Sequence, residues 1–125
     1  MEPKKRLGPG QRIRRQATFK RLVEQGQFVR GELCYLWVEK KECREKPDPR
    51  EKPMVGIVVS RKTDPTAVGR NRWKRRVREI FREHQSQLHP WAKCLVKVRH
   101  TQKKPSFLDV EEELVKLFKK AGVWA

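Results

Sequence analysis

Residues 68–84 read VGRNRWKRRVREIFREH and predict the helix around which the fold is organised. Successive residues of an α-helix advance by about 100°, so the large apolar side chains of this stretch fall into one stripe on the helix surface. These side chains are Trp73, Val77, Ile80 and Phe81. Thr66 stands just before the stretch and suits the N-cap position. We therefore expect an amphipathic helix with its apolar stripe in the core.

The remaining surface of this helix is strongly cationic. One flank carries Asn71, Lys74, Arg75, Arg78 and Arg82, the other carries Arg72 and Arg76, and Arg70 alone falls on the apolar side. A solvated helix face normally mixes both signs of charge, but here the acids are Glu79 and Glu83, near the C-terminal end. Such a density of one sign favours a phosphate-bearing partner.

Composition extends this expectation to the whole chain. The 125 residues are enough for one domain, and 32 Lys and Arg against 15 Asp and Glu leave a formal net charge of +17. A field of this strength suits a polyanion: a nucleic acid, an anionic membrane surface or an acidic protein. No apolar run approaches the roughly 18 residues of a membrane span, and the basic N-terminus lacks the apolar stretch of a secretory signal. The expected location is cytoplasmic.

The cysteines and histidines predict neither a disulfide framework nor a metal site. Cys34 and Cys94 lie in apolar runs and are expected to be buried thiols, whereas Cys43 lies in a charged segment and is expected to be exposed. The three cysteines form no C-x-x-C pair. His84 and His89 are five positions apart, which separates them on a helix surface.

The other elements are predicted from hydrophobic periodicity and from the positions of glycine and proline. Residues 16–26 predict a short amphipathic helix that stops at Gly26, and 27–39, 54–60 and 92–99 read as β-strand runs. A last helix follows Pro105, with Ser106 and Asp109 as a capping box. Its apolar face would comprise Val110, Leu114, Leu117 and Phe118.

This order predicts an α+β domain with helices packed on a small sheet. We expect a flexible basic N-terminus over residues 1–10, one domain with a phosphate-bearing partner over 11–123, and an exposed charged loop over 40–53. Residues 40–52, KKECREKPDPREK, have almost nothing to bury and are expected to form a solvated hairpin loop between two strands.

Three classes of protein are compatible with a chain of this charge, and the sequence supports them to different degrees. A protein nuclease would need converging carboxylates or a histidine acid–base pair, but the acids gather in the charged loop and in the first turn of the last helix. Sequence-specific DNA binding lacks a visible dimerisation element or helix-turn-helix spacing. A non-catalytic RNA-binding protein of ribosomal type fits the composition as well as any alternative.

Three stretches resemble the protein subunit of bacterial ribonuclease P. AVGRNRWKRRVREIFRE, residues 67–83, is similar to the signature helix of that family, VGIVVSRK, residues 55–62, to the strand before it, and RIRRQATFKRLVEQGQ, residues 12–27, to its first helix. The resemblance spans about residues 7–123. It implies the order α-β-β-(β)-α-β-α, a four-stranded sheet and the ribosomal protein S5 domain 2-like fold with a left-handed crossover.

The resemblance also implies a function. Family members bind a catalytic RNA subunit, and the complex removes the 5′ leader of precursor tRNA by endonucleolytic cleavage, which leaves the mature tRNA 5′ end. The implied Mg²⁺ is held mainly by the RNA, so no protein catalytic residues and no organic cofactor are expected. The implied partners are the RNA subunit, in a 1:1 complex, and precursor tRNA.

Two sets of binding residues are carried over by the resemblance. The set implied to bind the RNA subunit is Arg70, Asn71, Arg72, Lys74, Arg75, Arg76 and Arg78. The set implied to bind the leader is Phe19, Val23, Trp37, Ser60, Arg61 and Lys62. A plain core role is an equal alternative for Phe19. The chain departs from the family pattern at Val23, where a second aromatic is common, at Trp37, where tyrosine is common, and at 63–66, where the loop is one residue longer.

Overall fold

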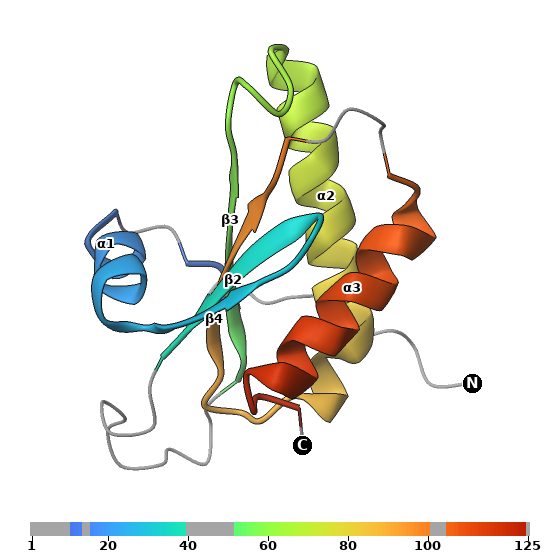
Figure 1. Ribbon diagram of the computed structural model, residues 1–125. Coiled ribbons are helices and arrows are strands. Elements are labelled where there is room, and N and C mark those ends of the chain that lie inside the picture. Colours follow the sequence, from blue (N-terminus) through green and yellow to red (C-terminus); the bar gives the residue numbers. More distant parts are fainter. Residues whose placement is uncertain (1–10, 14–15, 40–51, 101–104, 125) are drawn as a thin grey trace.

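The computed structural model describes residues 11–13, 16–39, 52–100 and 105–124 (Figure 1). A four-stranded sheet lies between helix α1 on one side and helices α2 and α3 on the other. The elements in chain order are α1 Gln16–Gln25, β1 Gln27–Arg30, β2 Cys34–Val38, β3 Met54–Val59, α2 Ala67–His84, the short 3₁₀ helix η3 Gln85–Gln87, β4 Lys93–Val98 and α3 Phe107–Lys120. The predicted α+β class and element order are confirmed.

The sheet order is β1-β2-β4-β3, which corrects the expected hairpin. Residues 27–39 form two antiparallel strands, β1 and β2, with a turn at 31–33. The predicted hairpin through 40–52 is wrong, because β4 lies between β2 and β3, antiparallel to the first and parallel to the second. Strand β4 takes this inner position because Cys94, Leu95 and Val96 are all buried, so both of its faces need cover.

Most of the predicted loop lies outside the described residues. Residues 1–10 and 40–51, and with them Cys43, are not described. At the end of the predicted loop Lys52 is exposed, but Pro53 is buried, and its carbonyl accepts a hydrogen bond from Gln11 Nε2 at 3.2 Å. Gln11 is itself buried and also reaches Gln85 Oε1 at 3.0 Å. These bonds attach residues 11–13 to the rest of the domain.

Helix α2 begins as its sequence predicts. The Thr66 hydroxyl accepts a hydrogen bond from the Gly69 amide at 3.0 Å, and Asp64 in turn accepts from the Thr66 amide at 2.9 Å. Arg70 Nη1 donates to the carbonyls of Asp64 and Pro65, at 3.1 Å each. Hydrogen bonds between the 63–66 loop and the first turn of α2 therefore hold this loop in place.

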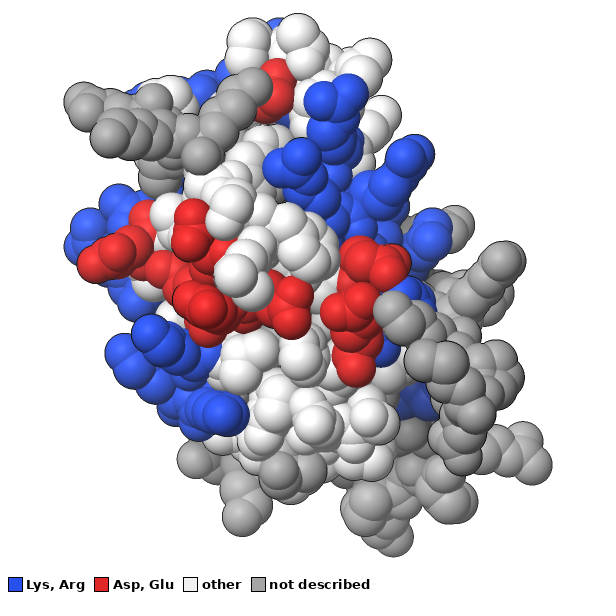
Figure 2. Space-filling model, turned by 90° about the vertical axis from the view of Figure 1, so that its right-hand side faces the viewer, with Lys and Arg blue, Asp and Glu red and all other residues white. Residues whose placement is uncertain are grey.

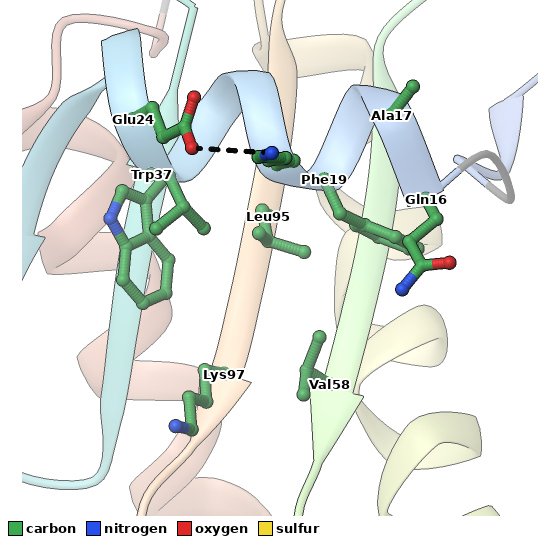
Figure 3. Close-up of a pocket in the computed structure, with 10 residues that line it drawn as sticks. Gln16, Ala17, Phe19, Glu24, Trp37, Val58, Leu95 and Lys97 are labelled. Carbon is green, nitrogen blue, oxygen red and sulfur yellow. Dashed lines mark ion pairs between the residues drawn. The ribbon is translucent and has the colours of Figure 1, made fainter.

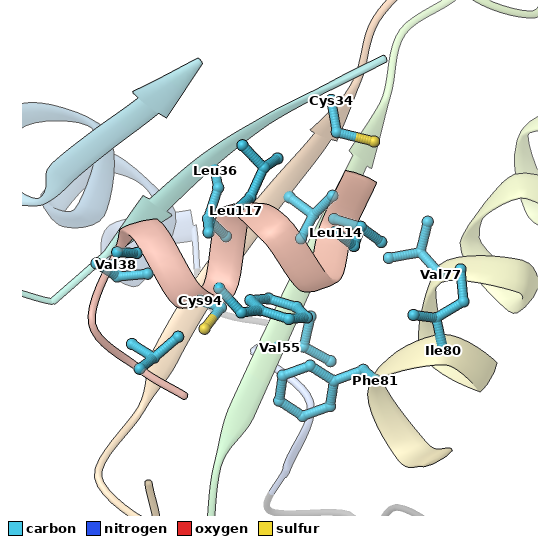
Figure 4. Close-up of a cluster of buried hydrophobic side chains, with 14 of the residues drawn as sticks. Cys34, Leu36, Val38, Val55, Val77, Ile80, Phe81, Cys94, Leu114 and Leu117 are labelled. Atoms are coloured by element: carbon cyan, nitrogen blue, oxygen red, sulfur yellow. The ribbon is translucent and has the colours of Figure 1, made fainter. Parts of the chain in front are cut away.

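The main core lies between the sheet and the two long helices (Figure 4). The predicted apolar stripes of α2 and α3 are buried there. The Phe81 and Phe118 rings pack edge to face, with their centres 6.2 Å apart. The Ser106–Asp109 capping box forms, and Gly122 with φ of 77° follows the end of α3. Cys34 and Cys94 are buried, as predicted, and burial raises the pKa of each thiol to about 12.

A smaller cluster holds α1 against the opposite face of the sheet. Ile13, Leu22 and Leu95 are buried in it, and the partly buried Phe19, Trp37, Met54 and Val58 pack around them. Because α1 is short, it covers only part of this face. The rest of the face lies open beside the helix.

Candidate RNA interfaces

The N-terminal half of α2 presents a continuous cationic surface. Asn71, Arg72 and Arg75 are exposed, and Lys74, Arg76 and Arg78 are half-buried. In Figure 2 one group of Lys and Arg lies at the upper right, Asp and Glu form a band across the middle, and further Lys and Arg lie at the left edge and below the band. The guanidinium of Arg76 lies 5.5 Å from the centre of the Trp73 ring, which anchors that cation beside the core. Ordered cations on a rigid helix suit a phosphate backbone.

Arg70 differs from the other predicted RNA-binding cations. Its side chain is half-buried, and Nη1 donates to two loop carbonyls. This arginine stabilises the junction between the 63–66 loop and α2, which fits its expected place on the apolar side of the helix.

The C-terminal half of α2 carries both signs of charge. Arg82 forms a two-pronged ion pair with Glu79, and this hydrogen bonding raises the pKa of the guanidinium. His84 Nε2 lies 3.3 Å from a carboxylate oxygen of Glu111 on α3. The unbalanced positive charge of α2 is therefore concentrated over residues 70–78.

Two of the α2 cations face a hollow beside strand β3. Lys74 and Arg78 line it together with Arg12 and Phe19, and its volume is about 390 Å³. Arg12 is held there because the Ile13 amide donates to the Val55 carbonyl at 2.9 Å. Arg12 is a cation that sequence reasoning did not assign, although the basic run around it was visible.

Three of the predicted leader-binding residues meet in one cleft between α1 and the sheet (Figure 3). Phe19 and Val23 come from α1 and Trp37 from β2, and the cleft has a volume of about 670 Å³. The remaining lining residues are Gln16, Ala17, Lys20, Glu24, Val58, Leu95 and Lys97. An ion pair of 4.0 Å between Lys20 and Glu24 lies at its α1 side. Val23 is 49% exposed, so the cleft wall that it forms is open to solvent.

The register of the sheet explains this arrangement. Phe28, Trp37, Leu95 and Gly56 are paired in one cross-strand row, and Arg30, Tyr35, Lys97 and Val58 are paired in the row two residues along each strand. Both rows point to the α1 side of the sheet, because side chains two residues apart share a face. The floor of the cleft is therefore apolar, with the cation of Lys97 at one end.

Gly56 determines how closely Phe19 approaches the sheet. A β-carbon at this position would overlap the Phe19 ring and would lie 3.2 Å from the β-carbon of Ile13. The ring of Phe19 thus packs on bare backbone and also lines the cleft. Phe19 is thus partly packed in the small cluster and partly open to the cleft, and its role in leader binding stays a prediction.

The other three predicted leader-binding residues lie outside the lining of this cleft. Ser60, Arg61 and Lys62 follow the end of β3, and Arg61 and Lys62 are exposed. Ser60 Oγ accepts a hydrogen bond from the Thr63 amide at 3.3 Å and lies 3.2 Å from the Thr63 hydroxyl. The structure therefore gives Ser60 a role in the turn that precedes α2.

Sequence reasoning missed Gly56, Val58, Leu95 and Lys97. A glycine inside an apolar strand is a known sign of close approach by another group, so Gly56 carried a signal. Lys97 interrupts the apolar run of β4 and carried another. Val58 and Leu95 had no local signal, because only the register assigns them to the α1 side.

Within the described residues, no group of three or more His, Cys, Asp or Glu side chains is placed to hold a metal ion. Among the same residues no helix has both the length and the apolar character needed to cross a membrane.

A small α+β domain with an ordered cationic helix and an apolar cleft between a helix and a sheet has the features of a protein that binds nucleic acid. The family model described as Ribonuclease P matches residues 7–122, and the chain belongs to this family. The ribonuclease P protein component of Pseudanabaena is 34% identical over 112 residues, which cover 90% of this chain and 91% of that protein.

Solved structures agree with this assignment. The ribonuclease P protein of Staphylococcus aureus matches with a TM-score of 0.75 and 28% identity, over 92% of this chain and 98% of that one. The ribonuclease P protein of Thermotoga maritima matches with a TM-score of 0.72 and 27% identity, over 87% and 96% of the two chains. The fold expected from the sequence resemblance is thus shared with bacterial ribonuclease P proteins.

Proposed function

We propose that this chain is the protein subunit of a ribonuclease P holoenzyme, in which it binds the catalytic RNA through α2 and the 5′ leader of precursor tRNA through the cleft. The observation that carries the proposal is the assembly of Phe19, Val23 and Trp37 in one cleft on the α1 side of the sheet. This cleft adjoins the cations of α2, because Phe19 also lines the hollow that Lys74 and Arg78 face. Two adjacent surfaces would allow one small domain to hold two RNAs at once.

The α2 surface suits a folded RNA. The major groove of an A-form helix is too narrow for side chains to read, so recognition relies on shape and on the backbone. Arg72, Arg75 and Arg76 would contact phosphates, and the buried stripe of α2 would keep them in a fixed array. Asn71, Lys74 and Arg78 extend the array, and Arg70 positions it through the 63–66 loop. We propose a 1:1 complex with the RNA.

The cleft suits a single strand. Unpaired bases stack on aromatic side chains without regard to sequence, and each stacked base contributes roughly 1–3 kcal/mol. Trp37 and Phe19 offer such surfaces, and Lys97 lies where a backbone phosphate could be neutralised. Arg61 and Lys62 would extend phosphate contact past the end of β3. A leader held here would bring the precursor, but not the mature tRNA, to the catalytic RNA with added affinity.

The chemistry of cleavage is assigned to the RNA subunit. When bound, Mg²⁺ would supply the activated water and stabilise the leaving oxygen. The protein would contribute by binding and orientation.

The test of the leader site uses Trp37→Leu in the reconstituted holoenzyme. We expect the affinity for precursor tRNA to fall by about fivefold or more, in keeping with the loss of one stacked base, while the affinity for mature tRNA stays nearly constant. Phe107→Leu, an exposed aromatic on α3, is the matched control and should change neither affinity. An equal loss for both tRNAs, or a loss of the folded circular dichroism spectrum, would reject Trp37 as a leader contact.

A second experiment separates holoenzyme subunit, independent nuclease and non-catalytic RNA-binding protein of ribosomal type. Precursor tRNA is incubated at low Mg²⁺ with the protein, with the catalytic RNA, and with both. The proposal predicts efficient cleavage only in the mixture. Cleavage by the protein alone would favour the nuclease, and no effect of the protein on the RNA would favour the ribosomal-type alternative.

A further inference from the structure

An aromatic surface continues from the cleft onto the β1–β2 hairpin, which α1 does not cover. The ring of Phe28 lies 5.1 Å from that of Trp37 and 5.4 Å from that of Tyr35. Phe28 is 48% exposed although it is large and apolar. Trp37 belongs to the cleft lining, and Phe28 and Tyr35 do not. The cleft therefore has an open aromatic extension at this side.

A cation is fixed against this extension. The guanidinium carbon of Arg99 lies 4.8 Å from the centre of the Tyr35 ring, and its Nη1 donates to the Gly31 carbonyl at 2.8 Å. Lys97 is the β4 partner of Tyr35, so its side chain stands on the same face. We call Phe28, Tyr35 and Arg99 the hairpin strip. Aromatic faces with interleaved cations are the surface that single-stranded nucleic acids require.

The charges change where this surface ends. Arg99 also lines a hollow behind the 31–33 turn, and the other charged side chains of that hollow are Arg30, Glu32, Asp109, Glu112, Glu113, Lys116 and Lys120. Both signs of charge are mixed there, whereas Arg99 and Lys97 are both cations beside Tyr35. A polyanion would therefore gain more from the open sheet face than from the hollow behind the turn.

Stabilisation of the hairpin is the alternative role for these rings, because cross-strand aromatic pairs contribute to sheet stability. This role predicts an effect on unfolding and none on RNA. It also does not require Phe28 to remain half exposed or a guanidinium to lie over the Tyr35 ring. The two roles make different predictions for RNA binding.

We propose that the hairpin strip binds unpaired leader nucleotides beyond those held in the cleft, with bases stacked on Phe28 and Tyr35 and a phosphate near Arg99. This inference rests on the proposed function, since it lengthens the same leader site. It gives the holoenzyme a preference for precursors whose leaders are long enough to reach the hairpin.

The first test measures the affinity of the holoenzyme for precursor tRNAs whose leaders are lengthened one nucleotide at a time. In the unmodified protein the affinity should rise in two stages, as the leader fills the cleft and then the hairpin strip. Phe28→Leu should remove the second stage, a loss of about fivefold for long leaders, and leave the shortest leaders unaffected. Phe28→Trp keeps an aromatic face and should retain both stages.

The second test removes the bases instead of the rings. Long leaders with abasic residues at the distal positions should lose the same affinity as Phe28→Leu does, and the two changes together should cost no more than either alone. Additive losses would overturn the proposal, as would a loss that is equal for short and long leaders, or no loss at all. Thermal unfolding of each variant shows whether the hairpin is intact, and Tyr35→Leu provides a second probe of the strip.

The outcome for Trp37→Leu separates this inference from the proposed function. If Trp37→Leu weakens precursor binding and Phe28→Leu does not, the cleft binds the leader and the strip does not. If neither variant weakens precursor binding, the leader site itself is rejected.

Discussion

Gly56 and Phe19 show how two residues far apart in the chain define one wall of the cleft. The ring of Phe19 rests where any β-carbon at position 56 would be, so the depth of the cleft depends on the absence of a side chain. The half-buried ring touches the small cluster of Ile13, Leu22 and Leu95 on its inner side. A single aromatic residue thus both attaches α1 and offers a stacking surface.

We predict that Gly56→Ala weakens precursor binding, because the Phe19 ring must move away from the sheet. Overpacking of this kind costs roughly 1–3 kcal/mol, and the measurement is the affinity for precursor relative to mature tRNA, with thermal unfolding in parallel. The double variant Gly56→Ala with Phe19→Leu is the control. If the alanine acts through the ring, the two substitutions will not be additive, whereas additive effects would point to another cause.

The buried thiols allow a second prediction at this scale. Since their pKa values are raised to about 12, Cys34 and Cys94 should react with a disulfide reagent at pH 8 only after the protein unfolds. The variant Cys43→Ser removes the thiol that lies outside the described residues. Rapid reaction of both thiols in the native protein would contradict the burial.

The same pKa values determine a pH dependence. Well below pH 9 both states keep these thiols protonated, but between about pH 9 and 12 the thiols are mostly ionised in the unfolded chain and mostly protonated in the folded chain. The free energy of unfolding should therefore fall in this window, by up to about 1.4 kcal/mol per pH unit and per thiol, as measured by urea unfolding.

At the scale of elements, the surface of α2 differs both around the helix axis and between its two halves. Its apolar stripe is buried, its N-terminal half presents cations, and its C-terminal half pairs Arg82 with Glu79 and His84 with Glu111. A stripe buried against the sheet fixes the backbone positions from which the cations project. This arrangement would reduce the entropy lost if a phosphate partner binds them.

We predict that Arg72→Ala and Arg76→Ala each weaken binding to the catalytic RNA and reduce the slope of log affinity against log salt by up to about one per lost phosphate contact. Lys116→Ala on α3 removes the same charge from an exposed position and is the matched control. Salt titrations of the three variants are compared. Equal slopes in all three would indicate that the α2 cations are merely solvated.

At the scale of the whole molecule, Glu113 connects the C-terminal helix to the first hairpin. Its carboxylate accepts hydrogen bonds from the backbone amides of Glu32, Leu33 and Cys34 at 2.6 to 2.9 Å. These amides form the turn between β1 and β2, on which the hairpin strip depends. The turn between β1 and β2 and helix α3, which are far apart in the chain, thus stabilise each other.

We predict that Glu113→Gln lowers the free energy of unfolding by about 1–3 kcal/mol, because an amide has only one accepting oxygen and turns an NH₂ group toward backbone donors. Glu112→Gln makes the same change of charge at an exposed neighbour and should have little effect. Urea unfolding compares the two. Similar losses for both variants would assign the effect to charge alone.

The sequence by itself determined the elements whose signals are local. The caps at Thr66 and Ser106, the buried stripes of α2 and α3 and the burial of Cys34 and Cys94 follow from helical periodicity and from hydropathy, which depend on near neighbours in the chain. The family signature is equally local, because its residues are contiguous on one helix.

Only the tertiary structure decided the sheet order and the composition of the cleft. The 40–52 segment looked like a hairpin loop because nothing local shows that β4, more than thirty residues later, inserts between β2 and β3. Val58, Leu95 and Lys97 became cleft residues through the same pairing, and Phe28 and Tyr35 became the neighbours of Trp37. Strand register is set by long-range burial and hydrogen bonding. This is why periodicity along the chain could find the cationic helix and the family resemblance could find Phe19, Val23 and Trp37, but neither could find the other residues that line the cleft.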